Sequence, residues 1–407
     1  MPLTPLGLIA FTAAFVAIVA LTLHRPRYAL AVVVATLPIA FYASIGDTMV
    51  TLGKVLLLGV CTGLLSRLRT LPDIRPLRPL LLAFGVVVVV ILCTLWPSEH
   101  RIETLREAAK WIEYALFLAV VYVLYRVDPD DALLRGAWLL SITVVCLSAL
   151  AQEVITPPIL IVLRGAPAPR VSGLLEGPNQ LAAYLEVALA VTCAWNLHAP
   201  QRVARYVFAL AACTLILTFS RAGIACALLA VIVVAAFERE RLRELIPAAA
   251  GALCGGAGVV LWWFLAPMRY HGAPITGPYA GGVGDRSELW RAALYFFRRH
   301  PLLGIGAGNF ELELPDAGVY GVRTHANNWY LQALAEGGVV LFAATLVWIV
   351  AVFRSLAHDV RRSPWRVAAF AASVALVAHQ CVDYLVFYPK VAESWIALIA
   401  LGIAGVL

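Results

Sequence analysis

Charged side chains are scarce in this sequence of 407 residues: Asp, Glu, Lys and Arg make up 14% of it, and 62% is hydrophobic. A soluble protein carries about a quarter charged residues, so this scarcity excludes an ordinary soluble enzyme. The few charges are also unbalanced, with a formal net charge of +7. No Lys/Arg-rich tail accompanies the excess, which argues against nucleic-acid binding and favours basic loops beside anionic lipid headgroups.

Cysteine is missing from the polar segments, although the sequence contains 8 cysteines. All of them lie in apolar runs and none forms a CxxC pattern, which excludes a disulfide framework in a loop and a zinc-binding cysteine pair. We interpret them as small apolar packing residues. The N-terminus likewise lacks the basic segment and the cleavage site of a signal peptide. We therefore expect residues 6–23 to be a retained transmembrane span and not a cleaved signal.

What the sequence does contain is a series of apolar runs, most of them near the roughly 17–25 residues that cross a bilayer. They are residues 6–23, 28–44, 50–66, 79–96, 111–126, 133–152, 180–198, 203–219, 221–237, 246–265, 329–353, 366–388 and 391–407. We expect an all-α polytopic membrane protein with about twelve transmembrane helices, or about thirteen if no run is partial or re-entrant. Residues 1–407 are expected to form a single transmembrane domain.

Arginines gather in alternate loops of this series. Because cytoplasmic loops are enriched in Lys and Arg, we place the richer set in the cytoplasm, and the long polar segment 267–328 then faces the periplasm. The richer set contains Arg25, Arg27, Arg67, Arg69, Arg75, Arg78, Arg126, Arg135, Arg202, Arg205, Arg239, Arg241, Arg243, Arg354, Arg361, Arg362 and Arg366. The outward basic residues, which this bias disfavours and which need another explanation, are Arg101, Arg106, Lys110, Arg164, Arg170, Arg221, Arg286, Arg291 and Arg323.

The segment 267–328 is the only long polar stretch, and a loop of this length is uncommon without a function. It contains Gly304-Ile305-Gly306-Ala307-Gly308-Asn309, which resembles a phosphate-binding loop. No strand is expected before it, so we predict a tight turn instead. His325 lies near the end of the segment. A structural hydrogen bond is the usual role of a lone histidine, but beside several outward arginines a general base is the sharper hypothesis.

Three shorter pieces carry further polar groups on the outward side. Residues 99–110 predict an amphipathic helix on the outer interface, either as a linker or as a substrate contact. Asn179 follows Pro178, where it can cap the next helix. Arg221 separates two apolar runs with almost no loop, and it either extends to lipid headgroups or takes part in a site.

Four sequence pieces then follow one another in order. They are Arg170…Gly173…Pro178-Asn179, Phe219-Ser220-Arg221-Ala222-Gly223, Arg286…Trp290…His300-Pro301 continuing to Phe310, and His325…Asn328…Tyr330-Leu331-Gln332…Glu336-Gly337-Gly338. In order and spacing they resemble the bacterial O-antigen ligase family, whose relatives are the O-antigen polymerases and the pilin O-oligosaccharyltransferases. The resemblance covers roughly the second half of the chain and the hydrophobic layout of the rest.

The resemblance implies a glycosyltransferase of lipopolysaccharide biosynthesis in the bacterial inner membrane, with a large periplasmic loop. Its donor would be a glycan carried on undecaprenyl diphosphate, and a ligase would pass that glycan to lipid A–core oligosaccharide. Membrane lipids would be its other partners. One position departs from the family, which commonly has His directly before the residue that matches Asn328. This sequence has Asn327 there, so we take His325 as the working histidine.

The implied chemistry assigns roles to the outward residues. Negative charge grows on the lipid diphosphate as it leaves, and either a divalent metal or arginines can neutralise it. The outward side lacks an evident acidic pair for a metal, so we expect no metal and no cofactor. We expect His325 to accept the proton of the attacking hydroxyl, with inversion at the anomeric carbon. The expected diphosphate ligands are Arg170, Arg221 and Arg286, with Arg291 and Lys110 as further contacts, and Asn179 and Asn328 would shape the loops.

Two alternatives stay open. An O-antigen polymerase of the same family would extend the glycan on its lipid carrier. A lipid-linked glycan flippase or transporter is the alternative from another class, and it would predict internal repeats and charges in the middle of the spans. We find neither feature in the sequence.

Overall fold

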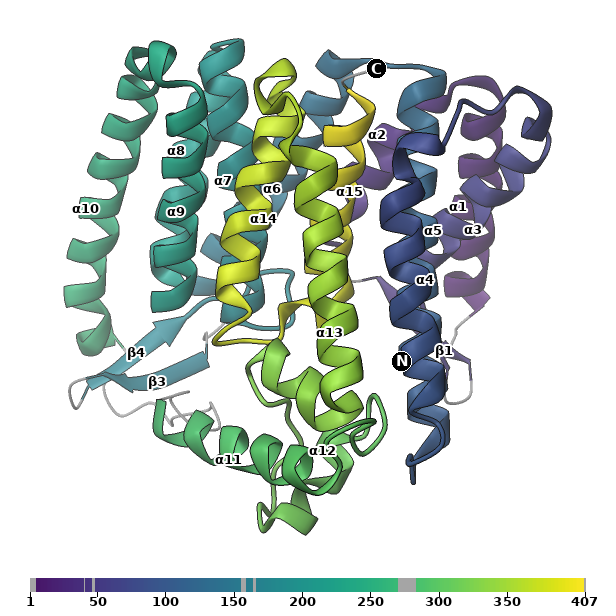
Figure 1. Cartoon of the computed structure of the whole chain (residues 1–407). Helices are drawn as coiled ribbons and strands as arrows, with labels where there is room; N and C mark the ends of the chain where they lie inside the picture. Colours follow the sequence, from purple (N-terminus) through teal and green to yellow (C-terminus); the bar gives the residue numbers. More distant parts are fainter. Residues whose placement is uncertain are drawn as a thin grey trace.

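The computed structural model describes residues 5–39, 41–45, 48–154, 159–163, 166–269 and 283–405. Most helices run side by side as a bundle, and α11 and α12 lie across one end of it (Figure 1). We call this end the site end, and the opposite end the basic end. The bundle helices are α1 Pro5–His24, α2 Pro26–Thr36, α3 Leu52–Leu65, α4 Arg78–Cys93, α5 Arg101–Val127, α6 Asp131–Val154, α7 Pro178–His198, α8 Arg202–Leu217, α9 Arg221–Phe237, α10 Ile246–Arg269, α13 Trp329–Ala357, α14 Pro364–His379 and α15 Pro389–Ala404.

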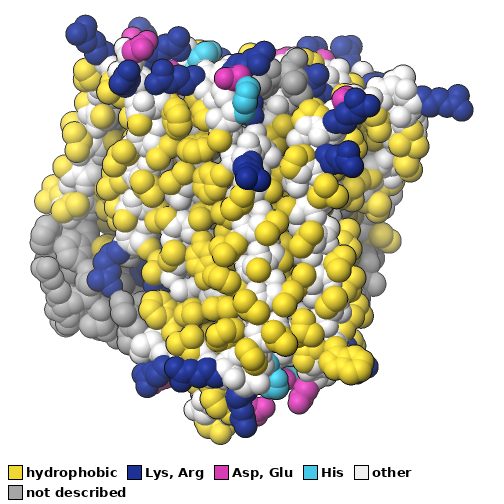
Figure 2. Space-filling view, viewed as in Figure 1, with side chains coloured by type: hydrophobic (Ala, Val, Ile, Leu, Met, Phe, Trp, Pro, Cys, Tyr) yellow, Lys and Arg dark blue, Asp and Glu magenta, His cyan; other side chains and the backbone are white. Residues whose placement is uncertain are grey.

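Each predicted apolar run overlaps one of these bundle helices, although α2 and α14 end well before the predicted ends of their runs. Among the described residues, 7 helices are long and apolar enough to cross a membrane, and three shorter apolar helices accompany them. This bears out a polytopic, mainly helical membrane protein, while the number of spans stays a prediction. The space-filling view agrees, because hydrophobic side chains cover the middle of the visible face and Lys and Arg gather towards the basic end (Figure 2).

Two short hairpins lie outside the all-α expectation. Strands β1 Tyr42–Ile45 and β2 Thr48–Thr51 pair antiparallel, as do β3 Ile159–Leu163 and β4 Ala166–Arg170. The first hairpin shortens the predicted run 28–44, because α2 ends at Thr36, shortly before Pro38. Proline cannot continue a helix, and residues rich in β-branched side chains then favour strands. Arg164 lies outside the described residues.

The amphipathic helix expected at residues 99–110 is not a separate element. It continues into the next apolar run as α5, because neither glycine nor proline interrupts the sequence from Arg101 to Val127. Its first turns are held by the loop of the site end, where the Thr104 hydroxyl donates to the carbonyl of Ala307 at 2.9 Å. The expectation of a helix lying in the interface plane was therefore wrong.

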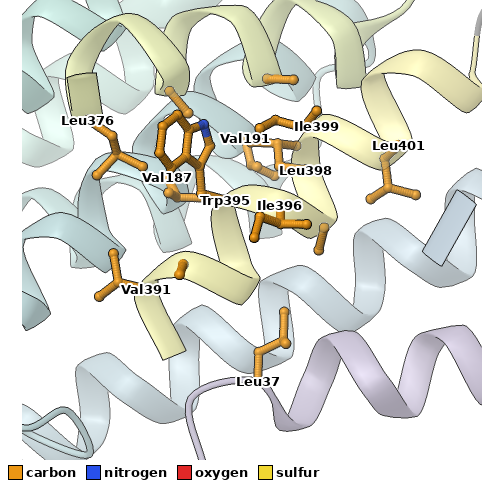
Figure 3. Close-up of a cluster of buried hydrophobic side chains, with 14 of the residues drawn as sticks. Leu37, Val187, Val191, Leu376, Val391, Trp395, Ile396, Leu398, Ile399 and Leu401 are labelled. Atoms are coloured by element: carbon orange, nitrogen blue, oxygen red, sulfur yellow. The ribbon is translucent and has the colours of Figure 1, made fainter. Parts of the chain in front are cut away.

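The core of the bundle surrounds α15. Its side chains are buried almost all round, as expected for a helix without a polar face. Val391, Trp395 and Ile399 pack among side chains of neighbouring helices (Figure 3). The indole of Trp395 donates to the Ser373 hydroxyl at 2.9 Å, which satisfies its one polar group. A rigid centre of this kind fixes the segment that precedes α15, and that segment belongs to the site.

The site end consists of α11 Val283–Arg299, the short helix α12 Phe310–Glu313 and a glycine-rich turn between them. Gly304 has φ of +61°, and an added Cβ there would lie 2.3 Å from the backbone of Glu336. The turn rests against a kink in α13, where Gly338 has φ of +60°. The amides of Ile305 and Gly306 donate to the carbonyls of Ala335 and Glu336 at 3.0 and 2.9 Å. The expected tight turn is present, and glycine is required for close backbone contact.

Candidate functional site

Arg170, at the end of β4, anchors the first group of polar side chains at the site end. Its Nε donates to the carbonyl of Thr218 at 2.8 Å, and one terminal nitrogen donates to Oδ1 of Asn179 at 2.9 Å. The amide nitrogen of Asn179 donates in turn to Oδ2 of Asp383 at 2.8 Å. Asn179 thus links a cation to an anion rather than capping α7, whose cap position is held by Gly177.

Arg286, on α11, completes this group. One of its terminal nitrogens lies 3.8 Å from Oδ2 of Asp383, and the side chains are 19% and 4% exposed. Arg286 therefore contacts Asp383 directly and Arg170 is linked to it through Asn179, although more than a hundred residues separate the two arginines in the chain. We call Arg170, Asn179, Arg286 and Asp383 the arginine cluster.

The arginine cluster is electrostatically unbalanced towards positive charge. Burial lowers the pKa of Arg170, the nearby Arg286 lowers it further, and Asp383 opposes both effects. Two guanidinium groups thus lie near one buried carboxylate, and only that of Arg286 contacts it directly. An added anion would relieve their repulsion, and guanidinium is well suited to phosphate oxygens.

The turn beside Arg170 carries backbone strain. Phe219 has φ of +51°, which is rare for a bulky residue, and strain of this kind concentrates at functional sites. It directly precedes Ser220, whose side chain caps α9, and Arg221, the first residue of that helix. Arg221 is exposed, and no hydrogen bond or ion pair joins its side chain to another described residue. It stays available for a ligand or for lipid headgroups.

His325 lies at the second group of polar side chains. It is 7% exposed, and its Nδ1 is 3.0 Å from Oε1 of Glu311 on α12, off the direction of an ideal hydrogen bond. Its ring also contacts Phe387 and Tyr384, with centroid distances of 3.9 and 5.2 Å. Gln332 braces the approach to His325 by accepting a 2.8 Å hydrogen bond from the amide of Ala326.

The contact between His325 and Glu311 changes the pKa of the Glu311 carboxyl group. The close contact with His325 lowers the pKa of Glu311 more than burial raises it, and Arg323 adds to the lowering. Glu311 is therefore ionised near neutral pH and holds a negative charge beside Nδ1. A carboxylate at one imidazole nitrogen fixes the ring and stabilises a proton received at the other nitrogen.

A pocket of about 690 Å³ opens in front of His325. Its wall includes the aromatic side chains of Tyr384 and Phe387, together with Lys110 from α5. Lys110 lies over the Phe387 ring at 4.7 Å from its centroid, and its amine is 2.6 Å from Glu107. Lys110 is thus placed with His325, and its charge is already matched by a carboxylate.

The segment 380–388 joins the two groups. Asp383 belongs to the arginine cluster, and the next residue, Tyr384, contacts His325. Asn328 holds this segment from the other side: it caps α13 by accepting from the amide of Leu331, and it donates to the carbonyl of Cys381 at 2.7 Å. The anion-attracting group and the histidine therefore share one continuous support.

Arg291 has a different environment from the other predicted arginines. It is exposed on α11, and its guanidinium donates to the carbonyl and the hydroxyl of Ser287 on the same helix, both at 3.3 Å. Asn327, at the position where the resembled family commonly has histidine, has φ of +48°, a conformation that asparagine tolerates.

One buried trio has the composition of a metal site. The ligand atoms of Glu186, Cys226 and His379 lie within 4.8 Å of one another on three helices. Nδ1 of His379 lies 2.5 Å from Oε1 of Glu186, so these two side chains are already hydrogen-bonded to each other. The trio lies away from the pocket lining, and we assign it no chemical role.

Sequence reasoning missed Asp383 and Glu311, the two carboxylates that organise the groups. Asp383 lies within the run 366–388, which was read as continuously apolar, whereas α14 ends at His379. The sequence Gln380 to Asp383 was a signal, since polar residues there interrupt the run. Glu311 had only the proximity of Asn309 and Phe310 to mark it.

Comparison with known proteins addresses the identity of the chain. Residues 206–346 match the family model described as O-antigen ligase, a range that includes Arg221, Arg286, Arg291, His325 and Asn328. No curated protein matches the chain. The matched family consists of membrane enzymes of the glycosyltransferase type, in keeping with the polytopic fold. Over this range, about a third of its length, the chain is therefore similar to the O-antigen ligase family.

Proposed function

We propose that this protein is an O-antigen ligase of the bacterial inner membrane. It transfers a glycan from undecaprenyl diphosphate to lipid A–core oligosaccharide on the periplasmic side, within lipopolysaccharide biosynthesis. In this proposal residues 1–407 form one transmembrane domain, and residues 267–328 form its periplasmic loop. The observation that carries the proposal is that His325 and Glu311 line a pocket close to the arginine cluster. Tyr384, which contacts His325, directly follows Asp383 of that cluster.

The donor diphosphate would bind at the arginine cluster. Arg170 and Arg286 have a single carboxylate near them, that of Asp383, so a diphosphate would supply the missing negative charge. Arg221 would reach the same ligand from the strained turn, because the Thr218 carbonyl holds Arg170 next to that turn. Charge-assisted hydrogen bonds from arginine would replace a divalent metal as the electrostatic partner of the leaving group.

The reaction would be a single displacement. The acceptor hydroxyl oxygen attacks the anomeric carbon and forms the new glycosidic bond, while the bond from that carbon to the diphosphate oxygen breaks. The electron pair leaves with the diphosphate, and the hydroxyl proton passes to the imidazole of His325. Glu311 stabilises the resulting imidazolium from Nδ1. Attack from the opposite face inverts the anomeric centre, so an α-linked donor gives a β linkage.

Deletion of the gene followed by gel analysis of lipopolysaccharide tests the proposal. A ligase predicts loss of the long-glycan ladder with the core band retained, and recovery of the ladder by the wild-type chain but not by His325→Gln. Core carrying a single added repeat would instead indicate the polymerase of the same family. Accumulation of glycan-loaded carrier lipid on the cytoplasmic side would indicate a flippase, and either result would overturn the ligase assignment.

A further inference from the structure

The pocket in front of His325 has an unusual charge inventory for an enzyme of anionic lipids. Its lining contains three basic side chains, Lys54, Arg106 and Lys110, against the carboxylates of Glu103, Glu107, Glu113, Glu176, Glu311 and Glu336. Carboxyl groups therefore outnumber lysine and arginine side chains in the lining, in contrast to the arginine cluster. Such a lining repels anions and attracts groups that donate hydrogen bonds.

Each basic side chain of the lining is also already paired within the pocket. The nitrogen-to-oxygen distances are 2.6 Å for Arg106 with Glu103, 2.6 Å for Lys110 with Glu107 and 3.9 Å for Lys54 with Glu113. An entering phosphate or carboxylate would have to compete with a resident carboxylate for every one of these cations. The pocket thus offers an anion no free cation among the residues that line it.

The remaining carboxyl groups have no lysine or arginine partner within the lining. Glu336 is 4% exposed, and it accepts hydrogen bonds from the neutral amides of Phe310 at 3.2 Å and Gln332 at 2.8 Å. Glu176 is paired with Lys390 at 3.1 Å, outside the lining, and Glu311 faces the imidazole of His325. Hydroxyl and ammonium groups would find acceptors on these side chains.

Aromatic rings complete one wall of the pocket. Tyr384, Phe387 and Tyr388 line it, and the first two contact the ring of His325. Aromatic faces with carboxylates beside them provide both the apolar surface and the hydrogen-bond acceptors that a polyhydroxylated ring needs. The base and this surface lie in one cavity, so an acceptor hydroxyl held on the wall would lie near His325.

We propose that this pocket is the acceptor subsite and that it selects a terminal sugar without an anionic substituent. A neutral ring or an amino sugar is accepted, whereas a ring that carries phosphate or carboxylate is rejected. The inference rests on the proposed ligase function. Opposite charges of the two groups then keep the substrates apart, with the donor diphosphate at the arginine cluster and the uncharged acceptor ring at the glutamates.

Competition between acceptors tests this selectivity without any variant. Purified wild-type protein would ligate a lipid-linked donor to lipid A–core in the presence of an octyl hexoside, an octyl 2-amino-2-deoxyhexoside or an octyl hexoside 6-phosphate. We expect the amino and neutral glycosides to compete at least about tenfold better than the phosphate, since like charges oppose binding. Equal or stronger competition by the phosphate, or no competition by any glycoside, would overturn the inference.

Two variants test the cause of the selectivity. Glu103→Gln and Glu113→Gln remove the carboxylate partners of Arg106 and Lys54, respectively. Each variant should therefore reduce, by several-fold, the ratio between the inhibition by the neutral glycoside and the inhibition by the phosphorylated one. Glu240→Gln, exposed in η3 Arg239–Leu245 and away from the pocket lining, is the matched control and should leave the ratio unchanged. An unchanged ratio in both pocket variants would contradict the charge argument.

The two proposals fail in distinguishable ways. If the wild-type protein transfers no glycan to lipid A–core, the ligase function fails and this inference falls with it. If transfer proceeds and the phosphorylated glycoside competes as well as the neutral one, only the acceptor selectivity is refuted.

Discussion

Replacement of Glu311 by Gln tests whether the carboxylate acts through His325. The side chains keep their size, but the negative charge 3.0 Å from Nδ1 is lost. If His325 receives the acceptor proton, this charge stabilises the imidazolium in the transition state and not in the ground state. Glu311→Gln should therefore lower kcat and leave KM for the donor nearly unchanged.

The size of the effect follows from the geometry. At 3.0 Å, two unit charges interact by about 5 kcal/mol if the effective dielectric constant is about 20. The Glu311 side chain is 32% exposed, so water and ions screen the interaction, and we reduce the value to about 1–2 kcal/mol. This corresponds to a loss of roughly 5- to 30-fold in kcat. Loss of the base itself in His325→Gln should cost about 10²–10⁴-fold.

Single-turnover ligation by purified protein, with thermal unfolding as a check of folding, measures both effects. In the His325→Gln background, Glu311→Gln should cause no further loss, because it acts through the imidazole. Glu288→Gln, exposed on α11, serves as the control. Nearly wild-type transfer by His325→Gln would refute the general base, and additive losses in the double variant would refute the orienting role of Glu311.

Four further predictions concern charge, metal, topology and pH. Arg286→Ala should lower kcat/KM for the donor by about 10- to 150-fold, because roughly 1.5–3 kcal/mol of charge-assisted hydrogen bonding is lost. Arg286→Lys should keep partial activity, and the exposed control Arg298→Ala should show none of this loss. An equal loss in the control would contradict a local role. Ligation should persist in excess chelator, and activity restored only by magnesium or manganese would reject the arginine mechanism. In a cysteine-free background, Tyr320→Cys should react with an impermeant maleimide in spheroplasts, since the Tyr320 side chain is 75% exposed. Arg69→Cys should react only after lysis. The reverse labelling pattern would invert the orientation. His325 lowers the pKa of Glu311 from its ordinary value of 4.5, so the pair stabilises the fold above that pH, and this stabilisation is lost as the pH falls through the lowered pKa. The difference in Tm between wild type and Glu311→Gln should therefore shrink in acid. A difference in Tm that stays constant with pH would exclude this linkage.

Much of the fold could be predicted because apolar runs of bilayer length leave few alternatives. The break between α8 and α9 at Ser220 coincides with the prediction, since a charged residue interrupts two apolar runs there. The hairpins could not be read in the same way, because a short apolar run fits a strand as well as a helix. The continuity of α5 through residues 101–127 was missed because charges suggested a boundary where no helix breaker occurs.

The candidate site was only partly accessible to sequence reasoning. Arg170 and Arg286 could be selected because basic residues on the outward side contradict the expected charge bias. Their approach to Asp383, through Asn179 for Arg170 and directly for Arg286, depends on tertiary contacts between β4, α7, α11 and the segment after α14, which no local pattern encodes. Lys110 was selected for its charge alone, and its close pairing with Glu107 depends on helix geometry.

The contact between the glycine-rich turn and the kink of α13 has a consequence for biosynthesis. The amides of Ile305 and Gly306 find their acceptors on residues 335 and 336, which are made later and enter the membrane with the following helix. Until then, water must satisfy these amides, and the apolar face of α11 lacks its partner. The candidate site is therefore completed late, only after α13 and the segment 380–388 have left the ribosome. A nascent chain stalled before Gly338 would lack the support that holds the glycine-rich turn, and the candidate site could not form.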